Sequence, residues 1–116
     1  MLAWNADGFM KGDGGVKLVN WIIRWKTERY IARVDRIIDV ATRLLDSNVN
    51  VRRDMQKCIE RVEGLDPRPV GTSEFIGRCR VGIIMAEQKI KETIDVLDEA
   101  VKLKEELIDV LLKHRD

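Results

Sequence analysis

Apolar residues recur three and four positions apart along almost the whole chain, and this spacing limits the fold more than any other feature of the sequence. It places apolar side chains on one side of an α-helix. The only prolines, Pro67 and Pro69, lie together outside these runs. The chain of 116 residues has the size of one domain, and 45% apolar residues allow it a modest core. The sequence therefore predicts an all-α protein.

Three helices are predicted, in an antiparallel up-down-up arrangement. The first covers about 16–46, and an Asp-Ser-Asn cluster at 46–48 is typical of a helix end followed by a new start. The second runs from 49 or 50 to 63, before a glycine and the turn at 66–71. The third covers 72–114.

The first 15 residues are predicted to form an irregular N-terminal arm. Four glycines within eight positions, from Gly8 to Gly15, disfavour a helix there. This leaves 16–116 as a single helical domain.

The predicted helices differ in length, and the difference favours a partner chain. At about 1.5 Å per residue, the three helices are roughly 45, 20 and 60 Å long, so the second half of the third helix would protrude. Its apolar residues cover too wide an arc to remain in water. One solution is a fold-back near Gly82, which gives a four-helix monomer. Because 81–83 has no turn sequence, we favour self-association as a homodimer with coiled-coil-like packing. The residues expected in this interface are Ile90, Ile94, Leu97, Val101, Leu107, Ile108 and Leu111.

An aromatic patch is predicted at the start of the first helix. Leu18, Trp21 and Trp25 project opposite to the apolar stripe that includes Ile23 and Val34. Packing by the N-terminal arm or by the third helix would cover the patch. The alternative is a docking surface for an unidentified protein partner, since tryptophan is frequent in interface hot spots.

Arginines are concentrated in the first two predicted helices. Residues 1–80 hold 15 Lys and Arg against 11 Asp and Glu, whereas 81–116 hold 6 against 9. A basic helical face can contact the phosphates of a nucleic acid. The interleaved acidic residues favour instead a surface of intrahelical ion pairs. The candidate phosphate contacts are Arg29, Arg33, Arg36, Arg43, Arg52 and Arg53.

Two cysteines, Cys58 and Cys79, lie at similar distances from the turn between the second and third helices. In antiparallel helices they would lie at one level on facing stripes. Buried free thiols and a disulfide are both compatible with this placement. A disulfide, like the many charged residues, would suit a thermophile.

Residues that usually carry catalysis or hold cofactors are scarce. His114 is the only histidine, and two cysteines cannot complete a zinc site. The glycines at 8–15 lack the pattern of a nucleotide-binding loop. We therefore expect no catalytic residues, no metal and no cofactor. Without a recognisable signal peptide or an apolar run of about 20 residues, a cytoplasmic protein with no membrane span is expected.

These patterns together predict a non-enzymatic helical scaffold or adaptor that self-associates and docks a protein partner. The alternative is a small nucleic-acid-binding protein that contacts the phosphate backbone through its arginine-rich face.

Overall fold

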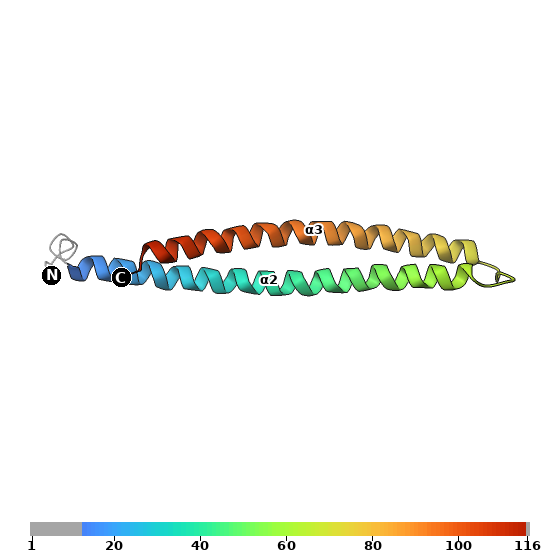
Figure 1. The fold of residues 1–116 in the computed structure, drawn as a ribbon, viewed down its shortest axis with the longest axis horizontal. Coiled ribbons are helices and arrows are strands. Elements are labelled where there is room, and N and C mark those ends of the chain that lie inside the picture. The colour runs from blue at the N-terminus through green and yellow to red at the C-terminus, as the bar shows by residue number, and fades with distance from the viewer. Residues whose placement is uncertain (1–12, 116) are drawn as a thin grey trace. The chain divides into compact units, whose positions relative to one another are not determined.

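The computed structural model describes residues 13–115 and has two long α-helices (Figure 1). Helix α2 runs Asp13–Glu63 and helix α3 runs Thr72–Lys113. No strand occurs in residues 13–115, so the all-α prediction is confirmed. Most of the predicted N-terminal arm lies outside the described residues. Its last three positions, 13–15, are helical rather than irregular.

The predicted helix break at residues 46–48 is wrong, because α2 continues through it without interruption. Serine and asparagine are weak helix formers, but each costs only a few tenths of a kcal/mol, and the cluster contains neither proline nor glycine. The Asn48 side chain turns back along the helix, and its Nδ2 donates a hydrogen bond to the carbonyl of Leu44 at 2.9 Å. The three-helix arrangement is therefore replaced by two helices.

The alternative fold-back near Gly82 is also wrong, because α3 is continuous from Thr72 to Lys113. A glycine inside a helix costs about 1 kcal/mol relative to alanine, which weakens the helix without ending it. The helices contain 51 and 42 residues, or roughly 75 and 65 Å at 1.5 Å per residue. The expectation that half of the last helix outreaches every neighbour in its own chain is consequently wrong.

The connection between the helices occupies residues 64–71, where the two prolines lie. The amide of Gly64 donates to the carbonyl of Glu60 at 3.1 Å, which closes the end of α2. Gly71 has a φ of 86°, a conformation that residues with a Cβ rarely adopt. Next to it, the Thr72 hydroxyl donates to the Pro69 carbonyl at 2.5 Å. This bond satisfies the Pro69 carbonyl just before α3 begins.

The residues form two compact units, each of which contains parts of both helices. Ile38–Glu99 is a helical hairpin, in which the end of α2 and the start of α3 lie side by side next to the connection (Figure 1). The best-buried cluster of this hairpin comprises Ile59, Ile76 and Cys79. Partly buried side chains pack around this cluster, namely Met55, Cys58, Val62 and Ile83.

The other unit combines α2 up to Ile37 with α3 from Ala100 onward. Val34 and Ala100 are buried there, as is the side chain of Thr27. Lys104 Nζ lies 2.7 Å from Asp35 Oδ1, which joins the two helices and fixes their register. Nine residues beyond Lys104, α3 ends, and nine residues before Asp35 on the antiparallel helix is Lys26. The first turns of α2 in this unit therefore extend past the end of α3, as Figure 1 shows.

Candidate interaction surfaces

Two helices can shield only one side of each other, and the burial pattern follows from this. Among the described residues, no side chain has less than 2% of its surface exposed. Along α3, from Thr72 to Leu111, buried or half-buried residues recur at intervals that alternate between four and three residues. This is the spacing of a coiled-coil contact with one neighbouring helix. Many large apolar side chains outside this spacing remain exposed.

An apolar stripe runs along α2 outside the contact with α3. Ile37, Leu44 and Val51 are spaced seven residues apart, so they lie almost on one line along the helix. Their exposed fractions are 49%, 53% and 38%. The three- and four-residue spacing of the first predicted helix assigns Ile37 and Leu44 to the same apolar face as Val34, although Val34 is buried in the structure and they are exposed. Buried Val34 and Ala41 are also seven residues apart, so spacing alone does not distinguish the exposed positions from the core positions.

Helix α3 carries a second part of this surface. Val96 and Leu103 are also seven residues apart, and each is 46% exposed. The apolar stripe of the Ile38–Glu99 hairpin comprises Leu44, Val51 and Val96, and the apolar stripe of the other unit comprises Ile37 and Leu103. Each of these side chains is roughly half covered by its own chain.

In the Ile38–Glu99 hairpin, both helices turn their stripe residues to the same side. Gly82 lies fourteen residues before Val96, and a Cβ at Gly82 would meet the side chain of Met55. Met55 neighbours Val51 on the next turn of α2. Further along the same lines, Leu65 and Phe75 border one shallow hollow. These contacts place the stripe of α3 beside the stripe of α2.

In the other unit, the ion pair between Asp35 and Lys104 lies on the side opposite to Ile37 and Leu103. Asp35 lies one residue after buried Val34, whereas Ile37 lies three residues after it, which places the two on opposite sides of Val34. In the antiparallel helix α3, Leu103 lies on the side of Ile37 by the same geometry. The Asp35–Lys104 ion pair and the Ile37–Leu103 pair therefore lie on opposite sides of this unit.

The residues predicted for self-association divide into two groups. One group is half-buried at the four-three positions of α3 and faces its own chain: Ile90, Leu97, Leu107 and Leu111. The other group is exposed: Ile94, Val101 and Ile108. The reason for the division is the length of α2, which provides an intrachain neighbour that the predicted short helix would not.

The predicted docking patch coincides with the start of α2, and Leu18, Trp21 and Trp25 are all exposed. The indole rings of Trp21 and Trp25 are stacked, with centroids 6.4 Å apart and planes 10° from parallel. The guanidinium of Arg29 lies over the Trp25 ring at 4.9 Å from its centroid. We call Trp21, Trp25 and Arg29 the aromatic–arginine ladder.

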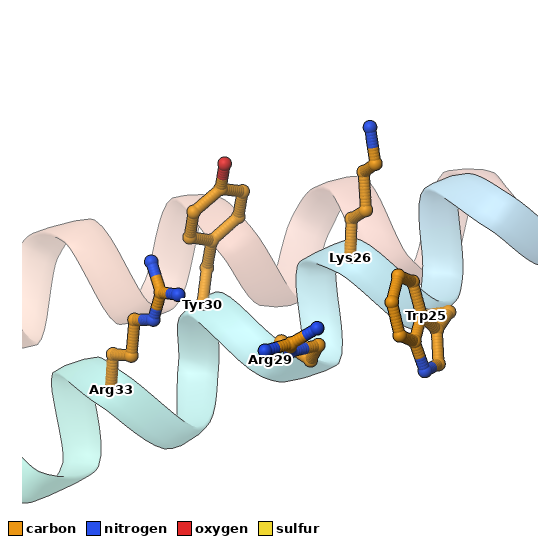
Figure 2. Close-up of a pocket in the computed structure, with 5 residues that line it drawn as sticks. All are labelled: Trp25, Lys26, Arg29, Tyr30 and Arg33. Atoms are coloured by element: carbon orange, nitrogen blue, oxygen red, sulfur yellow. The ribbon is translucent and has the colours of Figure 1, made fainter.

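Figure 2 shows the part of α2 that follows Trp25. Arg33 approaches the ring of Tyr30, and its guanidinium carbon is 5.7 Å from the ring centroid. Trp25 and Arg29 stand in front of α2, whereas the ribbon of α3 passes behind it. These residues and Lys26 line a shallow cleft of about 160 Å³, smaller than the roughly 300 Å³ at which small-molecule pockets begin.

The six arginines predicted to contact phosphate are not brought together. Arg29 and Arg33 line the cleft of Figure 2, whereas Arg52 and Arg53 border a hollow that also contains Glu60 and Glu87. Arg43 Nη2 lies 3.1 Å from Asp39 Oδ2, one turn earlier. Arg36 is exposed. A continuous arginine row is therefore replaced by separate groups, of which only the first borders aromatic rings.

Both cysteines are free thiols, so the disulfide considered from the sequence is not formed in the structure. Cys79 belongs to the buried cluster of the hairpin, and Cys58 packs against that cluster. Both thiols therefore contribute to packing as small apolar side chains.

The described residues define an all-α protein of two long helices with an exposed apolar stripe and an exposed aromatic–arginine ladder. Among residues 13–115, no group of three or more His, Cys, Asp or Glu side chains is placed to hold a metal ion. Within the same residues, neither helix is long and apolar enough to cross a membrane. Comparison of the chain with protein-family models, curated proteins and solved structures found no match.

Proposed function

We propose that this protein is a non-enzymatic helical scaffold that self-associates, with the apolar stripes of two copies packed against each other. The observation that carries this proposal is the half-exposed apolar stripe of each unit, formed by Leu44, Val51 and Val96 in the hairpin and by Ile37 and Leu103 in the other unit. Large contiguous apolar surfaces on soluble proteins mark interaction sites. A second copy supplies a surface of identical spacing, as a two-fold dimer requires.

The free energy gained when a second copy covers these side chains can be compared with the cost of association. Full burial of a large aliphatic side chain stabilises by roughly 1.5–3 kcal/mol, so covering its exposed half contributes about 1 kcal/mol. Two copies contribute ten such side chains, or on the order of 10 kcal/mol. This gain is comparable with the estimated cost of association, about 4–15 kcal/mol. The seven-residue spacing favours a four-helix assembly in which all stripe positions are covered along the helices.

The expected assembly differs from the one that the sequence predicts. Ile94, Val101 and Ile108 are exposed, but their spacing places them on the side of α3 opposite to Val96 and Leu103. They are therefore outside the proposed interface. In this assembly, each chain packs its own two helices against each other, and the second copy covers the apolar stripes that this contact leaves exposed.

Sedimentation equilibrium across the micromolar range tests the proposal. The wild-type chain should give twice its mass of 13.4 kDa. Leu44→Glu places an unpaired charge in the interface of each copy, and we expect the dissociation constant to rise about a hundredfold or more. Because Leu44 is exposed within one chain, the helical circular dichroism should be retained.

Ile84→Glu is the matched control for Leu44→Glu. Ile84 is 65% exposed on α3 and lies off the stripe, so the same chemical change there should leave the mass unchanged. A wild-type chain that remains monomeric at 100 μM would contradict the proposal. So would a Leu44→Glu variant that associates as tightly as wild type.

A further inference from the structure

The aromatic–arginine ladder occupies the most basic part of α2. Residues 17–33 contain five Lys and Arg and one acidic residue, whereas residues 34–63 contain six basic and six acidic residues. The net charge of α2 is therefore concentrated around Trp21 and Trp25. This charge favours an anionic partner for the segment.

The aromatic side chains of this segment are available to a ligand. Trp21 and Trp25 remain 54% and 45% exposed in the unit to which they belong. Trp21, Trp25 and Arg29 are each four residues apart, so they form one ridge with a rise of about 6 Å between neighbours. The ring–ring and ring–guanidinium stacking holds flat surfaces along this ridge. Single-stranded nucleic acids bind surfaces of this kind, because their bases stack on flat groups and their phosphates are attracted by positive charge.

We infer that Trp21, Trp25 and Arg29 form a binding site for single-stranded nucleic acid. Unpaired bases stack against the exposed parts of the two indoles, and phosphates contact Arg29 and the surrounding basic side chains, among them Lys26 and Arg33. Every base has a flat face, so stacking of this kind is largely independent of sequence. The open ridge also suits a polymer better than a small molecule, because it encloses little volume.

A lipid surface is the main competing partner, and the distribution of side chains favours nucleic acid. An interfacial helix separates a continuous apolar face from a basic face. Here the cation lies on the aromatic ridge itself, with the Arg29 guanidinium covering the Trp25 ring. Insertion of that ring into the acyl region would first require the guanidinium to leave it, which would give up the cation–π contact.

Fluorescence titration with a 20-nucleotide oligodeoxythymidylate tests the inference. We expect binding to quench tryptophan emission and to weaken steeply with salt. Trp25→Ala and Trp21→Ala should each reduce affinity about tenfold, and Trp25→Phe should retain most of it because it keeps a stacking ring. Arg29→Ala should weaken binding and lower the salt slope by about 0.7.

Arg43→Ala is the charge-matched control, because Arg43 is paired with Asp39 and lies outside the ladder. It should leave affinity within about twofold of wild type. Leu44→Glu should also retain binding to the oligonucleotide, so failure of self-association and failure of nucleic-acid binding can be told apart. Circular dichroism of each variant verifies that the helices are intact.

Three results would overturn the inference. Equal binding of an abasic strand or a duplex of the same length would show attraction by charge without stacking. Binding of anionic phosphatidylserine vesicles without binding of the oligonucleotide would identify a lipid surface. Tryptophan emission that changes only with protein concentration would show that a second copy covers the ladder.

Discussion

Gly77 and Gly82 are both interior positions of α3, and replacing each with alanine separates helix propensity from packing. A Cβ at Gly77 would have no atom within 4 Å. A Cβ at Gly82 would fall inside van der Waals contact with Met55 Sδ and would lie 2.6 Å from its Cε. The two substitutions are chemically identical, and only the neighbour on α2 differs.

The expected magnitudes follow from this difference. Gly77→Ala should stabilise the protein by about 1 kcal/mol, the difference in helix propensity between glycine and alanine. Gly82→Ala gains the same amount, but it forces the flexible end of Met55 away from its preferred torsion angles. That change costs about 0.5–1.5 kcal/mol. The net effect at Gly82 should therefore be close to zero.

Removal of the Met55 side chain should release the conflict. In a Met55→Ala background, Gly82→Ala should recover the full gain of about 1 kcal/mol, which gives a coupling of about 1 kcal/mol in a double-mutant cycle. Gly77→Ala should give the same gain in both backgrounds, because it has no contact to lose.

Urea and thermal unfolding followed at 222 nm measure these differences, and 1 kcal/mol corresponds to a shift of about 4 °C in Tm for a chain of this size. Protein concentration must be held constant, because association raises the apparent stability. If Gly82→Ala stabilises wild type as much as Gly77→Ala does, or if the cycle is additive, Met55 does not pack over Gly82 and the register of the hairpin is wrong.

Three further predictions concern the core, the turn and the ion pair. Ile59→Ala removes the best-buried large side chain and should destabilise the protein by about 2–4 kcal/mol in urea unfolding. Ile84→Ala, at an exposed position, should change stability by less than about 0.5 kcal/mol. Equal effects of the two substitutions would contradict the assigned core. Gly71→Ala should lower stability by about 1–2 kcal/mol because of its positive φ alone, since its Cβ would meet no neighbour; an unchanged Tm would argue against this turn. The Asp35–Lys104 ion pair is partly exposed. A double-mutant cycle of Asp35→Asn and Lys104→Gln should therefore show a coupling energy below about 1 kcal/mol, and this energy should decrease in 1 M salt. A coupling energy well above about 1 kcal/mol would indicate that the pair is shielded from water.

The sequence was sufficient to predict helices, the position of the turn and the start of α3. These features depend on local chemistry: apolar residues at three- and four-residue spacing, two prolines that no helix tolerates inside it, and a threonine at the helix start. The break at 46–48 was wrong for a physical reason. Local preferences of Ser47 and Asn48 amount to tenths of a kcal/mol, whereas continued packing of α2 contributes more than that.

The candidate surfaces show the same division. The position of the tryptophans on one helix face and the basic charge around them could be identified from the sequence, because they depend on residue type and helical spacing alone. Whether another segment covers these tryptophans could not be predicted in this way. Only the coordinates show that Arg29 and Arg33 contact aromatic rings whereas Arg43 pairs with Asp39. The sequence cannot decide this, since an arginine near an acidic residue can turn toward that residue or toward a ring.

The sequence by itself determined that this chain forms amphipathic helices with more apolar surface than two helices can cover. The tertiary structure alone decided which apolar residues are left uncovered. Leu97 and Leu103 are equally apolar and belong to the same helix, yet one is half-buried at the helix contact and the other is exposed on the stripe. The physical reason is that helical periodicity defines the sides of each helix, whereas only the position of the neighbouring helix determines which side loses its contact with water.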